Sequence, residues 1–367
     1  MIPFVDLKAQ YASIRRELEH ELLRAAAEAA YILGEDVPAF EREFAGWIGT
    51  GECVGVNSGT AAIQLGLEAL GIGPGDEVIA PANTFIASVL PVVKLGAEVV
   101  LVDCDEVSGQ IDVEAAAEAV TPRTRALIAV HLYGHPADLD RLVELCDARG
   151  IALVEDACQA HGALYKGRRV GSFGRFAAFS FYPSKNLGAL GDGGAITTDD
   201  VDLAALIRLL GRLGEHPKGT HAVAGWNERL DTLHAATLRV KLRHLERWND
   251  ARRQVAAWYD ELLEGVTTPV VEQWADPVWH LYVVRSPHRD ELRDRLAAAG
   301  IGTGIHYPTP LHLPPALRDR LRHEQGAFPN AEARAREQLS LPMYPELERD
   351  QVERVAAAVA SAVHASV

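Results

Sequence analysis

The chain has 367 residues, a length that predicts two domains or one large domain with an appendage. Hydrophobic residues make up 48% of it, and no apolar run is long enough to cross a membrane, so we expect a soluble globular protein. The net charge of −15 argues against nonspecific binding to nucleic acid or to anionic lipid.

The first residues lack the basic and then apolar pattern of a secretory signal. The four cysteines are scattered and show no CxxC spacing, so we expect neither a disulfide framework nor a metal site. Such cysteines are typical of small buried side chains in a cytoplasmic protein, which is the location that the sequence predicts.

Short apolar segments alternate with helical segments through the first 200 residues. We expect strands at 53–57, 77–80, 98–103, 126–132, 151–154 and 195–198, and helices after residue 60 and over 84–95, 112–120 and 138–149. With the aromatic strand that ends before Pro183 as the seventh, this alternation predicts an α/β fold, in which a mostly parallel sheet of seven strands lies between helices.

After residue 200 the pattern changes to longer helices. We expect a helical stretch over 232–263, a strand near 279–285, and helices over 290–299 and 349–363. These elements predict a smaller α+β domain at the C-terminus. We place the boundary at residue 245, so that 1–245 forms the large domain and 246–367 the small one.

In open α/β sheets, ligands bind beyond the carboxyl ends of the strands, and unusual residues follow several of the predicted strands. Ser58-Gly59-Thr60 opens a helix, where free N–H groups and the helix dipole suit a phosphate, although an ordinary helix cap has the same pattern. Phe85 follows the next strand and either stacks on a flat ring or packs under a helix.

Two carboxylates, Glu155 and Asp156, directly follow the strand at 151–154. Buried carboxylates are costly unless they are solvated or paired, and strand alternation places these two on opposite faces. We therefore expect one of them to point into the crevice. Asp156 is suited to keep a ring nitrogen protonated, and a helix cap beside a surface carboxylate is the alternative.

Lys185 lies in the most specific segment, where an aromatic strand ends in Tyr182-Pro183-Ser184 and a glycine-rich stretch follows. Lysine is rare here, with six lysines against 30 arginines. An amine in a dry site has a lowered pKa and forms Schiff bases readily, whereas a surface lysine is the plain alternative. Ser180 is placed to donate a hydroxyl to a phosphate.

These residues are together the components of a pyridoxal-phosphate (PLP) site: a lysine for the aldehyde, an acid for the ring nitrogen, an aromatic ring and a phosphate-binding helix start. All of them follow strands of one predicted sheet. The sequence therefore predicts PLP as the cofactor, with no metal.

The chain resembles the DegT/StrS family of nucleotide-sugar aminotransferases, a branch of the fold-type-I PLP enzymes. The resemblance extends over nearly the whole chain. It rests on these segments: Phe4-Val5-Asp6-Leu7, Tyr31-Ile32-Leu33-Gly34, Ser58-Gly59-Thr60, Asp76-Glu77-Val78-Ile79, Glu155-Asp156-Ala157-Cys158-Gln159-Ala160-His161-Gly162, Pro183-Ser184-Lys185-Asn186-Leu187-Gly188, Gly225-Trp226-Asn227-Glu228-Arg229-Leu230-Asp231 and Ile305-His306-Tyr307-Pro308.

The resemblance implies a role for each cofactor-binding position. Gly59, Thr60 and Ser180 would hold the phosphate, Phe85 would stack on the pyridine ring, and Asp156 would pair with the ring nitrogen.

For three further positions the resemblance implies the following. Gln159 would contact the ring hydroxyl. Lys185 would form the Schiff base and then move the proton during transfer. Asn227 would reach the phosphate from the other subunit, which implies a homodimer with shared active sites. Without the resemblance, Asn227 is an ordinary turn residue.

The family also implies the reaction, transfer of an amino group from an amino acid, expected to be glutamate, to a nucleotide-linked keto-sugar. The segment 302–312 looks closest to enzymes that aminate C3 of a dTDP-3-keto-6-deoxyhexose. Arg229, His306 and Tyr307 are candidate substrate residues. The alternatives are a 4-keto-sugar or keto-cyclitol aminotransferase and, from another class, a noncatalytic PLP-binding regulator.

Overall fold

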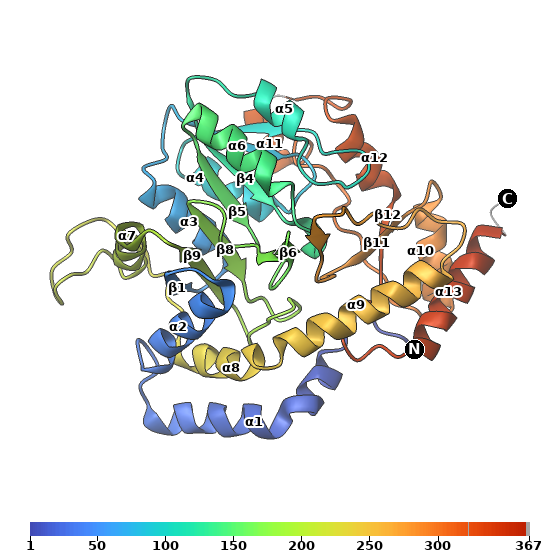
Figure 1. Cartoon of the computed structure of the whole chain (residues 1–367), viewed down its shortest axis with the longest axis horizontal. Coiled ribbons are helices and arrows are strands. Elements are labelled where there is room, and N and C mark those ends of the chain that lie inside the picture. Colours follow the sequence, from blue (N-terminus) through green and yellow to red (C-terminus); the bar gives the residue numbers. More distant parts are fainter. Residues whose placement is uncertain (322, 365–367) are drawn as a thin grey trace.

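The computed structural model describes residues 1–321 and 323–364 (Figure 1). Its main feature is a seven-stranded sheet with the strand order β1-β9-β8-β5-β4-β2-β3. The strands are β1 (Glu52–Val56), β2 (Glu77–Pro81), β3 (Glu98–Val102), β4 (Thr124–Val130), β5 (Ala152–Asp156), β8 (Phe176–Ser180) and β9 (Gly194–Thr198). Only β9 is antiparallel to its neighbours, so the predicted fold class is confirmed.

The strands of this sheet are apolar on both sides because helices cover both faces. On one face a core cluster contains residues of α2 (Asp36–Ile48), α5 (Val113–Glu118), α6 (Leu139–Arg149) and α8 (Thr232–Leu242). On the other face a second cluster contains residues of α3 (Gly59–Ala69), α4 (Leu90–Lys94), α7 (Val201–Gly211), α11 (Pro315–Leu321) and α12 (Pro329–Glu337). Packing on both faces therefore fixes the positions of the carboxyl ends of the parallel strands.

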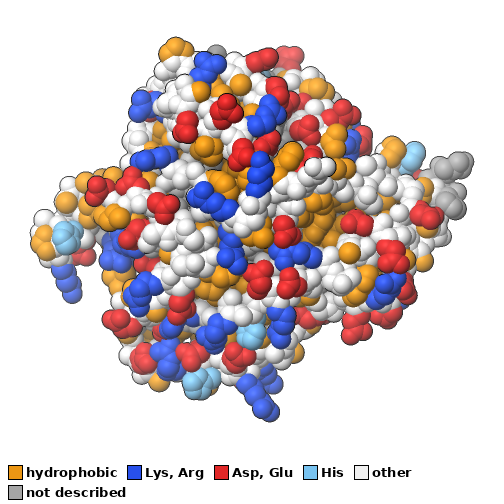
Figure 2. Space-filling model, viewed as in Figure 1, with side chains coloured by type: hydrophobic (Ala, Val, Ile, Leu, Met, Phe, Trp, Pro, Cys, Tyr) orange, Lys and Arg blue, Asp and Glu red, His pale blue; other side chains and the backbone are white. Residues whose placement is uncertain are grey.

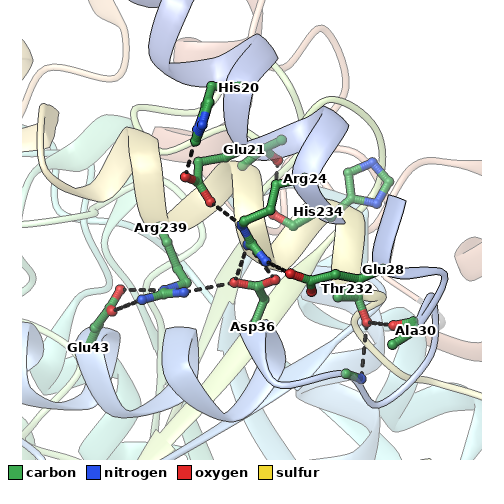
Figure 3. A network of polar contacts seen from close by, with 12 residues as sticks. His20, Glu21, Arg24, Glu28, Ala30, Asp36, Glu43, Thr232, His234 and Arg239 are labelled. Carbon is green, nitrogen blue, oxygen red and sulfur yellow. Dashed lines mark hydrogen bonds and ion pairs between the residues drawn. The ribbon is translucent and has the colours of Figure 1, made fainter. Parts of the chain in front are cut away.

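The N-terminal helix α1 (Leu7–Glu28) packs along α8, and a polar network joins both helices to α2 (Figures 1 and 3). The side chain of Asp36 is buried, and both of its oxygens accept hydrogen bonds from Arg24 Nη2, at 2.9 and 2.8 Å. Arg239 Nη1 lies 2.7 Å from the same carboxylate. Thr232 Oγ1 adds a hydrogen bond to the carbonyl of Ala30 at 2.6 Å. This network fixes the three helices to one another.

The C-terminal part has its own core cluster, to which Ile2 also belongs. Its elements are α9 (Leu245–Leu262), β11 (Tyr282–Arg285), α10 (Arg289–Ala298), β12 (Gln338–Leu341) and α13 (Arg349–His364). The helix α9 runs from α8 to this cluster (Figure 1), and β11 pairs with β12. The division at residue 245 stays a prediction, and it falls where α9 begins.

Smaller elements complete the chain. A three-stranded sheet has the order β10-β6-β7. Its strands are β6 (Leu164–Tyr165), β7 (Arg168–Arg169) and β10 (Ala275–Asp276), and two short 3₁₀ turns are η1 (Ile86–Ser88) and η2 (Leu132–Gly134).

Three expectations about elements were wrong in detail. The helical stretch over 232–263 is two helices, with a break at residues 243 and 244. The helix over 84–95 is the turn η1 followed by the short α4. The strand near 279–285 begins only at Tyr282, because Trp279 has a left-handed φ of 48°, which a strand cannot contain.

The surface carries both signs of charge. Acidic and basic side chains are interspersed over the face in Figure 2, with no broad area of either sign. In the described part of the chain, no helix combines the length and apolar character needed to span a bilayer.

Candidate active site

A cavity of about 320 Å³ opens at the carboxyl ends of the parallel strands. Nine of the residues predicted for the site line it: Gly59, Thr60, Phe85, Asp156, Gln159, Ser180, Lys185, His306 and Tyr307. Segments as far apart as β1 and the C-terminal part thus meet at one place, as the strand-exit argument predicted.

The start of α3 forms one end of the cavity. Ser58 caps this helix, since its Oγ accepts from Ala61 N at 3.1 Å and its carbonyl accepts from Ala62 N at 3.0 Å. Within the described part of the chain, the N–H groups of Gly59 and Thr60 therefore remain as free donors of the first turn. A Cβ at position 59 would lie 2.8 Å from Cβ of Ser180, so only glycine lets the backbone pass here. These donors suit a phosphate.

Asp156 is the carboxylate that faces the cavity, and it is 6% exposed. Ser88 Oγ donates to its Oδ2 at 2.6 Å, and the N–H of Cys158 donates to its Oδ1 at 3.2 Å. Both contacts fix the orientation of the carboxylate.

Glu155 lies on the opposite face of β5, as strand alternation predicted. It is fully buried and accepts hydrogen bonds from His131 Nε2 at 3.0 Å and from the amides of Gly171, Phe173 and Gly174 at 2.7 to 2.9 Å. Glu155 therefore holds the chain before β8 and leaves the cavity to Asp156.

Lys185 enters the cavity from the turn after β8. Burial lowers the pKa of its amine below the ordinary value, while the nearby Cys158 and Asp156 oppose this shift. Its Nζ lies 3.5 Å from Nε2 of His280. A lowered amine pKa increases the neutral fraction, which is the nucleophilic form.

Aromatic and histidine side chains close another side of the cavity. The ring of Phe85, which is 48% exposed, lies 5.2 Å from the ring of Tyr307. Gln159 Nε2 donates to the hydroxyl of Tyr307 at 3.0 Å. His306 lies 2.8 Å from Oγ of Ser340, and burial together with the Lys185 cation lowers its pKa to about 4.

Two predicted site residues lie outside this cavity. Asn227 is exposed in the segment that follows α7, and Nη2 of Arg229 donates to its side-chain oxygen at 2.5 Å. Neither residue lines the cavity of its own chain. Their predicted roles in the cofactor and substrate sites stay predictions.

Ser88 and His280 are polar lining residues that the sequence analysis did not predict. Ser88 was hidden in a stretch that we expected to be helical throughout. His280 stands in an apolar run that indicated a strand, and neither a glycine nor a carboxylate marks it.

The residues present fit PLP. Phosphate donors at the start of α3, the ring of Phe85, the carboxylate of Asp156 and the amine of Lys185 all line one cavity. The missing Cβ at position 59 lets the first turn of α3 lie directly against Cys158 and Ser180, which line the same cavity.

The sequence profile of the DegT/DnrJ/EryC1/StrS aminotransferase family matches residues 12–360. The chain belongs to this family. The predicted family, the predicted enzyme class and PLP as the cofactor are thereby confirmed.

Individual relatives match over almost their whole length. A dTDP-3-amino-3,4,6-trideoxy-alpha-D-glucose transaminase from Streptomyces venezuelae is 50% identical over 98% of this chain and 95% of its own. The erythromycin biosynthesis sensory transduction protein EryC1 of Saccharopolyspora erythraea is also 50% identical, over 97% and 98%. The crystal structure of S. venezuelae DesV with a ketimine intermediate superposes with a TM-score of 0.96, at 50% identity, over 98% of both chains.

Proposed function

We propose that this chain transfers an amino group from an amino acid, with glutamate as the donor, to the C3 ketone of a dTDP-3-keto-6-deoxyhexose. The observation that carries the reaction type is that Lys185 and Asp156 line one cavity at the sheet edge. The similarity to a transaminase named for a dTDP-3-amino sugar supports the substrate.

The cofactor, when bound, supplies an aldehyde that combines with amines and a protonated ring that takes up electrons. The amine of Lys185 holds the aldehyde and afterwards moves the proton between the two carbons involved in transfer. Asp156 keeps the proton at the ring nitrogen, because a nearby negative charge favours the protonated form.

The remaining residues bind and orient. The amides of Gly59 and Thr60, with the hydroxyl of Ser180, hold the phosphate at the positive end of α3. Phe85 covers the ring and excludes water. We infer that His306 and Tyr307, on the C-terminal side of the same cavity, contact the sugar.

We infer further that the working unit is a homodimer in which Asn227 reaches the phosphate of the partner's site. Asn227 is exposed, and its neighbour Trp226 is 44% exposed in the same segment. Ile32 and Leu33 are 53% and 46% exposed at the end of α1. Exposed apolar side chains of this size are typical of interfaces between subunits.

Two alternative functions fit the same cavity. Amination of a 4-keto-sugar or a keto-cyclitol requires the same cofactor residues, so only the product separates it from the proposal. A noncatalytic PLP-binding regulator is the reading that the name of EryC1 suggests for that relative. The position of the buried Lys185 amine in the cavity, where burial lowers its pKa, favours the enzyme.

The test uses protein loaded with pyridoxamine phosphate and a panel of 3-keto and 4-keto nucleotide sugars. We expect amination of the dTDP-linked 3-ketone about 100-fold faster than of its 4-keto isomer, because a site that fixes one ketone misplaces the other. NMR of the product locates the new amine. Faster amination at C4 would contradict the proposed substrate, and no amination of any sugar would contradict the enzyme.

A further inference from the structure

We propose that His280 is the positioning residue of Lys185, whose ε-ammonium donates a hydrogen bond to Nε2 of His280 whenever the amine is not covalently bound. This inference rests on the proposed function, because it concerns the amine that the function uses. The two nitrogens are 3.5 Å apart, and among the described residues no other hydrogen-bond partner of this amine is present.

The backbone turns His280 toward the cavity. Trp279 adopts a left-handed φ of 48° and packs its ring 5.4 Å from that of Tyr282, inside the C-terminal core. Arg252 Nη1, itself buried, donates to the carbonyls of Trp279 at 3.1 Å and of Met343 at 3.0 Å. Strained non-glycine conformations persist where the surroundings enforce them, and they are common at functional sites.

Lys185 and His280 are tied to each other through their chain neighbours. Asn186 Nδ2 donates to the carbonyl of Val278 at 2.8 Å, and the N–H of Val278 donates to the carbonyl of Gly134 at 3.0 Å. Asn186 follows the lysine directly, and Val278 stands two positions before the histidine. The separation between the amine and the ring is therefore set by buried backbone and amide contacts.

The environment keeps the imidazole of His280 neutral. The residue is 8% exposed, and burial lowers its pKa well below the ordinary value, an effect that the cations of Lys185 and Arg252 increase. A neutral imidazole has one nitrogen that accepts. Nε2 faces the lysine amine and is therefore the accepting nitrogen. The ring proton is then on Nδ1, which is buried without a partner among the described residues.

The amine has other charged and titratable neighbours. Asp156 and Cys158 face it from the end of β5 and favour its protonated form. His161 and His306 lie close enough for the lysine charge to lower the pKa of each. None of these four is hydrogen-bonded to Nζ within the described chain, which leaves His280 as the group that orients it.

Positioning matters because a lysine side chain has four flexible carbons. An amine that gives and takes a proton at a carbon must stay aligned with it, and small misplacements cost large factors in rate. His280 holds the amine without competing for its proton, since its own ring stays neutral.

The first experiment measures the titration of Lys185 directly. Protein loaded with pyridoxamine phosphate is treated with acetic anhydride across a pH series, and acetylation of Lys185 is read by mass spectrometry. Loss of the acceptor destabilises the ammonium, so His280→Leu should lower the midpoint by about half a pH unit or more. His280→Gln, which keeps an acceptor, should restore most of it.

Two controls complete this measurement. His135→Gln removes a histidine that lies outside the cavity and whose pKa burial lowers to about 4, and it should leave the midpoint unchanged. His280→Met repeats the apolar substitution should the leucine variant not fold, with thermal unfolding as the check. A wild-type midpoint in a folded apolar variant would overturn the proposal, and so would an upward shift.

The second experiment follows the donor half-reaction with glutamate deuterated at Cα. In His280→Leu the visible Schiff-base absorbance should remain, the rate should fall about 10- to 100-fold, and the deuterium isotope effect should rise because proton transfer becomes limiting. KM for glutamate should change little. An unchanged isotope effect would overturn the role of His280, whereas a wild-type protein without any transamination would refute the proposed function alone.

Discussion

Two adjacent carboxylates, Glu155 and Asp156, show how one position in a strand decides what a residue does. Asp156 faces the cavity and keeps one hydroxyl and one amide as partners. Glu155 faces the opposite way and is fully buried among hydrogen-bond donors. The same chemical group thus faces the cavity on one side of the sheet and supports the fold on the other.

Asp156→Asn should slow catalysis strongly and leave the fold intact. Opposite charges about 4 Å apart attract by about 4 kcal/mol at an effective dielectric near 20, and each 1.36 kcal/mol is a factor of ten in rate. We therefore expect the donor half-reaction to slow by roughly 100-fold or more, as measured by stopped-flow absorbance. An asparagine variant with near wild-type rate would show that the ring nitrogen is held by another group.

Glu155→Gln should have the reverse effect, a loss of stability. Burial raises the pKa of Glu155, but hydrogen bonds from His131 and from backbone amides outweigh it, and the pKa lies below its ordinary value. A depressed pKa gives stability that is present above the unfolded-state value near 4.3 and is lost as the pH falls through the folded-state value.

The measurement is urea unfolding of the wild type and the glutamine variant at pH 7 and pH 4. The variant should lose about 3 kcal/mol at pH 7, and the difference between the two proteins should shrink at pH 4. An equal difference at both pH values would argue against an ionised Glu155.

At the scale of elements, the start of α3 connects the sheet to the proposed phosphate site. The helix begins where β1 ends, and Gly59 lets it pass close to Ser180. The start of α3 lies close to the end of β1 because the turn between them is short and Ser58 caps the helix.

Gly59→Ala should weaken cofactor binding. The added Cβ would lie 2.6 Å from Sγ of Cys158 and 2.8 Å from Cβ of Ser180, so the first turn must shift away from the phosphate. We expect the Kd for PLP, measured by titration of the visible absorbance, to rise about tenfold or more. Gly46→Ala, on the exposed side of α2 with open space around it, is the matched control and should leave the Kd unchanged. Equal Kd values for both variants would contradict the phosphate assignment.

Most strands of the large sheet were predictable, because apolar segments bounded by glycine and proline turns are a local signal. The break between α8 and α9 was not, since no glycine or proline marks it and packing on two different cores decides it. The place of His280 depends on a backbone reversal at Trp279 that long-range contacts enforce. The local sequence pattern therefore predicted the lining residues that follow the strands of the large sheet. It did not predict His280, whose position depends on tertiary contacts.

The whole molecule is expected to be a dimer with shared sites, a prediction that one chain alone leaves open. Asn227 and Arg229 are outside the cavity of their own chain. They follow the loop that projects beyond α7 (Figure 1), and Asn227 pairs with Arg212 at the base of that loop. Such a placement is consistent with residues that complete a neighbour's site.

Mixing two inactive variants tests this arrangement. In a mixed dimer of Lys185→Ala and Asn227→Ala chains, shared sites leave one site with both residues intact. Random mixing should restore about a quarter of the wild-type activity, because half of the dimers are mixed and each has one intact site. If Asn227 served its own chain, mixed dimers would have no intact site and the mixture would be no more active than its components.

The most direct test of the whole account is to find the residue that binds the cofactor covalently. Borohydride reduction of the PLP-loaded protein, followed by peptide mass spectrometry, should place the cofactor mass on Lys185, and Lys185→Ala should lose both the label and all transamination. A label on another of the six lysines, or a protein that stays colourless and unlabelled with added PLP, would contradict the account.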